Sequence, residues 1–337
     1  MHYIDAFNHF IPARYFEAMA SAKGHQMSRR VRSIRSIHDL DERFRVMDQF
    51  GDYTQILSLA QPPIEAMGTV AETTALARLA NDGLAELVDR HPDRFAGHTA
   101  TLSMSDPEAA ARELERCVTQ NGANGVQIYT HVLGKPLDAP DFAVVFETAS
   151  ALDVPVLLHP ARTAAHSDYS AEERSQYEIW WTLGWPYETS AALARLVFSG
   201  LMDRLPDLKV VAHHLGGLIP YLEGRVGPGW DQLGARTADA DLSAVLERLE
   251  RRPLDYFKDF YADTATFGAK AAMVCGLDFF RSDRVVFASD SPFDPEGGPG
   301  YIRETIGILE SIGLPEQTLA DIAHGNARRI FRLKTNG

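Results

Sequence analysis

Short apolar runs recur along the chain and alternate with longer stretches that have helical periodicity. Many of these runs are rich in Val, Ile and Leu with few polar interruptions, which is typical of parallel strands buried on both faces. The helical stretches are clearest at residues 70–91 and 106–120, and Asp106 before Pro107 is a favourable helix start. We predict strands at residues 2–9, 53–59, 95–102, 125–130, 154–160, 208–214, 259–265 and 285–291.

Alternating strands and helices predict an α/β fold with right-handed crossovers. Eight such units in 337 residues predict a (β/α)8 TIM barrel, formed as a single domain over residues 1–337. An open doubly wound sheet is the alternative, but no GxGxxG motif follows the first strand, which disfavours its dinucleotide-binding version. Insertions at about 13–40 and 161–188 would follow the first and fifth strands, where barrel enzymes build their sites.

Composition narrows the classes of function. The net charge of -13 argues against a nucleic-acid partner, which would require a basic face. No apolar run approaches the roughly 20 residues of a spanning helix, and no signal peptide is recognisable, so we expect a cytoplasmic protein that does not enter the membrane. Cys117 and Cys275 form no CxxC pair and are expected to be reduced, buried thiols.

Polar side chains stand where several predicted strands end. His9 ends the first strand, His159 the fifth and Asp290 the eighth, and these ends would converge at one rim of a barrel. Two imidazoles and one carboxylate suit a divalent ion such as zinc, with an open position for water or substrate, although other transition metals remain alternatives. Taken singly, each residue could instead cap a strand or helix or make an ordinary hydrogen bond. Together they favour a metal site.

Two adjacent histidines, His213 and His214, end the sixth predicted strand. Strand alternation lets only one of them face the barrel interior. Alternation alone leaves open which of the two does so; the other would pack against helices or bond to backbone. At the first strand, "IDAFNHF" (4–10) places Phe7 on the same face as His9, where a second ligand could stand.

The chain resembles the amidohydrolase superfamily, and within it the branch of aminocarboxymuconate semialdehyde decarboxylase and related aromatic acid decarboxylases. The resemblance rests on the order and spacing of several runs, which cover nearly the whole chain. They are "RFRVMDQFGDYTQILSLAQPP" (43–63), "GVQIYTHVLGKPLDAPDF" (125–142), "VLLHPA" (156–161), "WPYETSAALARLVFSGLMDRLPDLK" (185–209), "LKVVAHHLGGLIPYLEGR" (208–225), "FASDSPF" (287–293) and "HGNARRIF" (324–331).

This resemblance implies a distorted (β/α)8 barrel with one divalent metal: zinc as our first expectation, manganese or cobalt as alternatives. It implies that His9, His159 and Asp290 are metal ligands, and that His214 lies at the rim beside the metal and, with Asp290, takes part in catalysis. His213 is then expected to turn away from the barrel interior. It also implies that Arg225 is shared across a homodimer interface and holds a substrate carboxylate. From the loop after the first strand, Arg32 is the candidate for a similar contact and Arg35 the alternative. Trp185 and Phe293, within the matching runs, complete the substrate-binding candidates.

The arginines of residues 28–35 fit a solvated loop equally well. The tryptophans of residues 161–188 favour packing or a subunit contact over contact with substrate. The chain also departs from the family at one position. The family's first strand usually ends in a His-x-His pair, and here Phe7 stands in place of its first histidine.

Three functions remain. The first is a non-oxidative decarboxylase of an aromatic or conjugated unsaturated carboxylic acid, in which a metal withdraws electron density and a nearby acid delivers a proton. The second is a hydrolase or hydratase that uses metal-bound hydroxide on a small carboxylate. The third is a metal-free, non-enzymatic binding protein, which Phe7 favours and the joint presence of His9, His159, His214 and Asp290 opposes. We rank them in this order.

Overall fold

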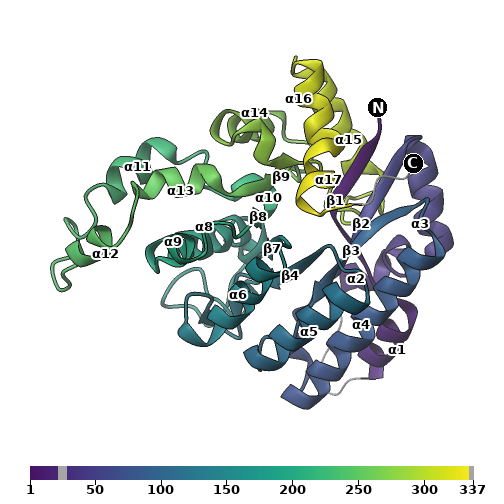
Figure 1. Cartoon of the computed structure of the whole chain (residues 1–337), viewed down its shortest axis with the longest axis horizontal. Helices are drawn as coiled ribbons and strands as arrows, with labels where there is room; N and C mark the ends of the chain where they lie inside the picture. Colours follow the sequence, from purple (N-terminus) through teal and green to yellow (C-terminus); the bar gives the residue numbers. More distant parts are fainter. Residues whose placement is uncertain (22–28, 334–337) are drawn as a thin grey trace.

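The computed structural model describes residues 1–21 and 29–333. In this part of the chain, parallel strands form one eight-stranded sheet whose neighbours follow chain order. Helices surround the strands (Figure 1). The strands are β1 (Tyr3–Phe10), β2 (Tyr53–Leu59), β3 (Phe95–Thr101), β4 (Gly125–Tyr129), β7 (Val156–His159), β8 (Val210–Ala212), β9 (Tyr261–Asp263) and β10 (Val285–Val286).

The sheet closes into a barrel between its first and last strands. Backbone N–H groups of Ala6 and His9 donate to the carbonyls of Phe287 and Ser291 at 2.9 and 2.8 Å, and Asp290 N–H donates to the Phe7 carbonyl at 3.1 Å. The predicted (β/α)8 barrel is therefore confirmed, and the open sheet is excluded, because an open sheet would leave these edges unpaired.

Helices follow each strand of the barrel. The described helices are α1 (Ala13–Ser21), α2 (Arg29–Ser33), α3 (Leu40–Met47), α4 (Val70–Arg90), α5 (Pro107–Gln120), α6 (Ala143–Ala151), α7 (Ile179–Thr182), α8 (Gly184–Phe198), α9 (Leu201–Arg204), α10 (His213–Gly216), α11 (Glu223–Trp230), α12 (Ser243–Glu247), α13 (Pro253–Asp259), α14 (Lys270–Phe279), α15 (Pro299–Ser311), α16 (Glu316–Ala320) and α17 (Asn326–Ile330). A short antiparallel hairpin joins β5 (His131–Val132) to β6 (Lys135–Pro136).

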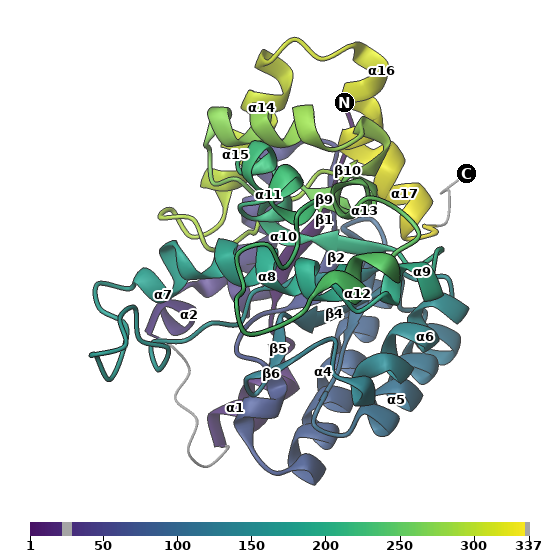
Figure 2. The ribbon, with the colours of Figure 1, turned by 90° about the vertical axis from the view of Figure 1, so that its left-hand side faces the viewer.

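The helices begin where their capping residues indicate. The Asp106 side chain accepts the N–H of Ala109 at 3.0 Å at the start of α5, as expected. At the start of α4, Thr69 and Glu72 form a reciprocal capping box. Of the two predicted insertions, the first contributes α1 and α2, and its residues 22–28 lie outside the described residues. The second reaches α7 and the start of α8 on one side of the molecule (Figure 2).

Two apolar cores hold the barrel together. The larger lies between the strands and the helices, and a smaller one joins side chains from opposite strands, so it fills the barrel interior. On β8 the interior core includes Val211, whereas Val210 and Ala212 belong to the outer core. Among the described residues, no helix combines the length and apolar character needed to cross a bilayer.

Three predicted strands end earlier than expected. β8, β9 and β10 end at Ala212, Asp263 and Val286, so several of the polar residues assigned to strand ends lie in irregular backbone. Two of these, His214 and Asp290, have positive φ angles of 55° and 59°. Such angles are uncommon for residues other than glycine. At these residues the direction of the side chain therefore does not follow from strand alternation.

Candidate metal centre and active site

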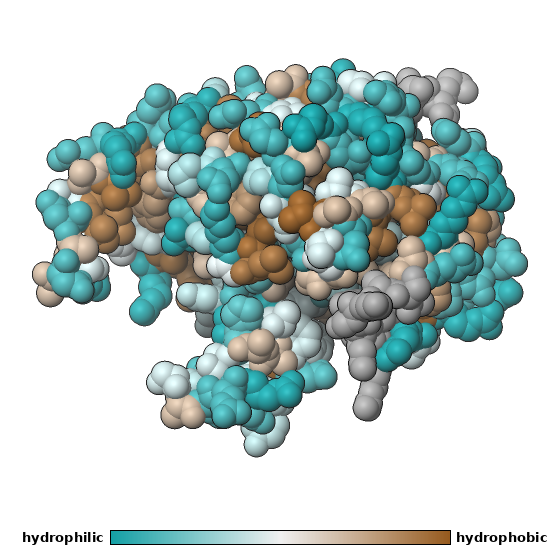
Figure 3. Space-filling view, turned by 90° about the horizontal axis from the view of Figure 1, so that it is seen from below, coloured by the Kyte–Doolittle hydropathy of each residue, from teal (hydrophilic) through white to brown (hydrophobic). Residues whose placement is uncertain are grey.

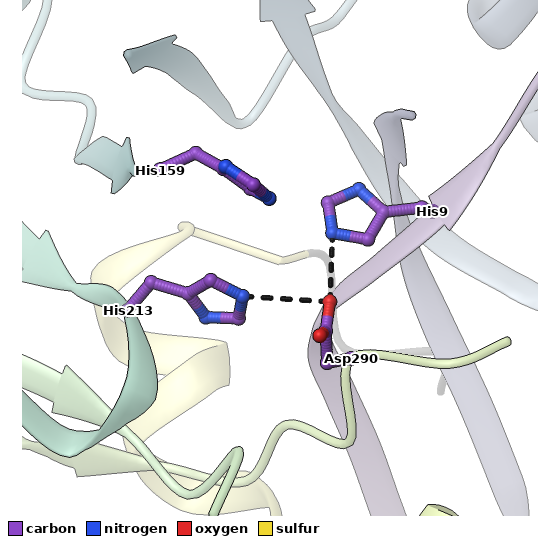
Figure 4. Close-up of side chains that lie close together, drawn as sticks. All are labelled: His9, His159, His213 and Asp290. Carbon is purple, nitrogen blue, oxygen red and sulfur yellow. Dashed lines mark ion pairs between the residues drawn. The ribbon is translucent and has the colours of Figure 1, made fainter. Parts of the chain in front are cut away.

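Four side chains from four different strand ends meet at the rim of the barrel. They are His9 on β1, His159 on β7, His213 directly after β8 and Asp290 after β10 (Figure 4). One nitrogen or oxygen from each lies within 4.8 Å of the others, and all four residues are buried. The structure therefore brings together the three expected ligands and adds His213, which forms a group that could hold a divalent ion.

The atoms of this group point toward one another. His9 Nε2 lies 3.0 Å from Asp290 Oδ1, and His213 Nε2 lies 3.4 Å from the same oxygen. Within the described residues these three buried atoms have no proper hydrogen bond. Since buried polar atoms are normally satisfied, a shared cation explains their arrangement.

The charge states of Asp290 and His159 suit a cation, whereas His213, despite its burial, has a pKa raised to about 9 by the carboxylates of Asp263 and Asp290. Burial raises the pKa of Asp290, but contacts with His213, His214 and His9 outweigh this and hold it well below its usual range. Burial, reinforced by repulsion from His213 and His9, lowers the pKa of His159 well below its ordinary value. A carboxylate and a neutral imidazole are the forms that bind metal.

Outer contacts orient the rings. His9 Nδ1 lies 3.3 Å from the Leu59 carbonyl, and His159 Nδ1 lies 2.8 Å from the Pro160 carbonyl. Each ring therefore turns its Nε2 away from the backbone. A hydrogen bond at the second ring nitrogen is how proteins commonly fix a ligating imidazole.

Arg43 supports the end of β1 from α3, and the sequence reasoning missed it. Its fully buried guanidinium donates to Asn8 Oδ1 at 2.7 Å, the His9 carbonyl at 3.2 Å and Gln55 Oε1 at 2.8 Å. The available signal was its helical spacing from Val46 and Met47, which are buried on the same helix. An arginine on an apolar face indicates a buried polar network.

The expectation that His213 turns away from the interior is wrong. Val211 faces the interior, so His213 two residues later shares that face. His214 nevertheless returns to the rim, because positive φ angles at His214 and Leu215 bend the chain back. Its Nε2 lies 3.7 Å from Asp290 Oδ2, and its ring stacks on that of His213 with centroids 3.8 Å apart.

The aromatic substrate-binding candidates surround the metal group. The Trp185 ring lies 5.7 Å from that of His159, and the indole N–H donates to the Arg162 carbonyl at 3.0 Å. The Phe293 ring lies 5.4 Å from that of His9. Phe7 is fully buried between His9 and His213, with ring centroids 5.4 and 4.1 Å away.

The candidate arginines Arg32, Arg35 and Arg225 lie outside the group of His9, His159, His213 and Asp290. Arg32 and Arg225 are exposed, on α2 and α11, and Arg35 is exposed and paired with Asp39 at 2.7 Å. In the described part of the chain, no ion pair joins any of these three arginines to the metal group. Arg30, which the sequence did not single out, donates to the Phe293 carbonyl at 2.7 Å and so brings α2 to the rim.

A further carboxyl group lies behind the rim and was also missed. Glu65 follows β2, and its carboxylate oxygens are buried without a hydrogen-bond partner among the described residues. Burial raises its pKa to about 7, and it interacts electrostatically with Tyr129, whose ring lies 5.2 Å from that of His159. The motif "QPPIEAM" carries no pattern that distinguishes this glutamate from a surface one.

Comparison with known proteins defines the class. Residues 4–333 match the amidohydrolase family, and the chain belongs to this family. It is 33% identical over 300 residues to a gamma-resorcylate decarboxylase of Polaromonas, covering 87% of each chain. It is 30% identical over 300 residues to the 2-amino-3-carboxymuconate-6-semialdehyde decarboxylase of Dictyostelium discoideum, covering 88% of this chain and 78% of the relative.

A solved structure of a decarboxylase supports the membership of this chain in the amidohydrolase family. The dihydroxybenzoic acid decarboxylase of Polaromonas, with bound manganese and the inhibitor 2-nitroresorcinol, is 30% identical and superposes with a TM-score of 0.79. The match covers 98% of this chain and 97% of that one. The resemblance to the decarboxylase branch of the superfamily is thereby confirmed, and the relatives support the expected carboxy-lyase class of enzyme.

Proposed function

We propose that this protein is a metal-dependent, non-oxidative decarboxylase of an aromatic or conjugated unsaturated carboxylic acid. The observation that carries the proposal is the buried group of His9, His159, His213 and Asp290, with His214 beside it, in a chain whose relatives are decarboxylases. His9, His159 and Asp290 would hold the ion. When bound, a divalent ion supplies Lewis-acid polarisation of a substrate oxygen next to the reacting carbon.

His214 is the proposed acid–base group. Decarboxylation breaks the bond between the ring carbon and the carboxylate, leaves the electron pair on that carbon and requires a proton there. The His214 imidazole takes a proton from a substrate hydroxyl and returns it to this carbon, while Asp290, 3.7 Å away, steadies the charged form of the ring. Burial, reinforced by repulsion from His213, lowers the pKa of His214 below the ordinary value near 6.5, so the imidazole is neutral and can take up a proton.

The walls of the site suit a flat, apolar ring with a charged end. Trp185 and Phe293 flank His159 and His9 and would contact the ring of the substrate. Arg32 remains the proposed partner for its carboxylate, supported by the contact of neighbouring Arg30 with the Phe293 carbonyl. This hydrogen bond brings α2 close to the site while the Arg32 side chain stays exposed.

We also propose a homodimer in which Arg225 reaches the site of the second copy. Arg225 is exposed on α11, and Tyr221 just before this helix is 81% exposed. In Figure 3, hydrophobic residues gather at the left-hand end of the molecule, where Figure 1 places α11 to α13. Exposed apolar surface beside an exposed arginine is typical of an interface.

The proposal also specifies which metal ion binds, with zinc first and manganese second. Two imidazoles and one carboxylate favour zinc on ligand chemistry, as expected from the sequence. Manganese is the second candidate, because it is present in the similar Polaromonas structure. The free thiols Cys117 and Cys275 support a reducing, cytoplasmic location.

A screen for carbon dioxide tests the proposed reaction. Purified protein of known metal content would be incubated with hydroxylated benzoic acids and with conjugated unsaturated acids, and the carbon dioxide and the remaining acid measured. We expect stoichiometric release from at least one acid, with His214→Asn as the matched control of low activity. Incorporation of solvent oxygen into one of these acids, without release of carbon dioxide from any of them, would instead favour the hydrolase or hydratase.

A further inference from the structure

Asp263, at the carboxyl end of β9, aims its buried carboxylate at the start of α10. Oδ2 is in hydrogen-bond contact with His213 Nδ1, and Oδ1 accepts the backbone N–H groups of His214 at 3.1 Å and Ala265 at 3.0 Å. One side chain therefore fixes both the ring of His213 and the sharp turn at His214. Because Nδ1 is engaged, only Nε2 of His213 is available to another group.

That free nitrogen faces the metal group. His213 Nε2 lies 3.4 Å from Asp290 Oδ1 and, within the described residues, has no hydrogen-bond partner. A carboxylate on one imidazole nitrogen and a metal on the other is a common way in which proteins orient a ligating histidine. Without an ion, the fully buried Nε2 would carry the desolvation cost of an unsatisfied polar atom.

Phe7 explains why a donor from across the barrel is needed. Its side chain shares the interior with His9 but has no atom that can bind a metal, and it packs against the His213 ring at 4.1 Å. β1 therefore contributes one ligand, His9. The position beside it is filled by a phenyl ring that contacts the imidazole of His213.

We propose that His213, held by Asp263, is the fourth ligand of the divalent ion and replaces the donor that Phe7 cannot supply. Asp263 is a positioning residue in this arrangement, and His214 remains free for proton transfer. The inference deepens the proposed function and rests on it, since it concerns the ion at the same site.

Pulsed electron paramagnetic resonance on the manganese-loaded wild-type protein tests this directly. The technique counts imidazole nitrogens bound to manganese, and we expect three, from His9, His159 and His213. Two bound imidazoles would overturn the proposal. This measurement needs no substitution, so it decides the matter even if a variant fails to fold.

Metal affinity of variants provides the second test. We expect Asp263→Asn to weaken manganese binding roughly 10- to 100-fold, the usual effect of losing an outer partner, and His213→Asn to weaken it at least as much. His98→Asn is the matched control, because His98 is another buried histidine but lies outside the metal group. Affinity of His213→Asn equal to that of the wild type would overturn the proposal.

A compensating pair tests whether His213 replaces a donor at position 7. Phe7→His combined with His213→Asn should bind manganese more tightly than His213→Asn alone, because the new imidazole lies where the old ring packed. Absence of any recovery in a folded double variant, judged by thermal melts of metal-free samples, would refute the replacement.

The outcomes separate this inference from the proposed function. A wild-type protein that binds no manganese or zinc and releases no carbon dioxide would refute both. A wild-type protein that binds the ion and decarboxylates, but with two coordinated imidazoles, would refute only the role of His213.

Discussion

Of the single side chains at the rim, His214 has the proposed role that can be tested most cleanly. We expect His214→Asn to keep its metal and its fold but to lose about 100- to 10,000-fold in turnover, the usual effect of losing an acid–base group. Initial rates, metal content and thermal melts of the variant would check this. Normal turnover by His214→Asn would remove the acid–base assignment.

Glu65 predicts a dependence of stability on pH. Burial raises its pKa from 4.5 to about 7, so the folded protein retains a proton that the unfolded chain releases. The stabilisation that comes with this retained proton is fully present below pH 4.5 and is lost as the pH rises through 7. The free energy of unfolding falls by about 3 kcal/mol over this range. Glu65→Gln should remove it.

Urea unfolding at pH 5 and pH 8 would measure this effect. We expect the free energy of unfolding of the wild type to fall, relative to that of Glu65→Gln, between the two pH values. The same pH dependence in both proteins would show that the Glu65 carboxyl is not perturbed in the folded state.

Residue by residue, the sequence indicates part of the site and misses part of it for physical reasons. That His9, His159 and Asp290 lie close together could be predicted, because the parallel strands of a barrel end at one rim. His213 was placed on the wrong face because alternation allows only one of two adjacent histidines to face the interior. The positive φ of His214, which returns its ring to the rim as well, is not revealed by the sequence.

At the scale of elements, α3 stabilises β1 through Arg43. We expect Arg43→Met to lower the free energy of unfolding by about 2–4 kcal/mol, because it leaves Asn8 and Gln55 buried with unmet hydrogen bonds. Arg43→Lys should not restore full stability, since lysine lacks the planar fork that reaches three acceptors. Urea unfolding would measure both, and a loss below about 0.5 kcal/mol, typical of surface positions, would contradict this role.

The elements themselves were largely predictable. Near-continuous apolar runs located all eight strands of the barrel, and Asp106 marked the start of α5. The early ends of β8, β9 and β10 were not predictable, because polar rim residues such as Asp263 continue the sequence pattern of the strand while the backbone departs from it. These departures occur at the proposed active site, where such strain is often concentrated.

At the scale of the whole molecule, the account predicts a dimer with shared sites. Arg225→Ala and His214→Asn chains should each be nearly inactive alone, and purified heterodimers of the two should recover activity, because one site then has both an intact His214 and a donated Arg225. Tagged co-expression and rate measurements would test this. Heterodimers as inactive as their parents, or a monomer in light scattering, would exclude sharing.

The most direct test of the central claim is a metal titration of activity. Chelator-treated protein would be titrated with zinc and, separately, with manganese, while carbon dioxide release is followed on the acid that the screen identifies. The account predicts that activity is lost on removal of metal, returns with added ion and saturates at one ion per chain. Full decarboxylase activity in metal-free protein would contradict it.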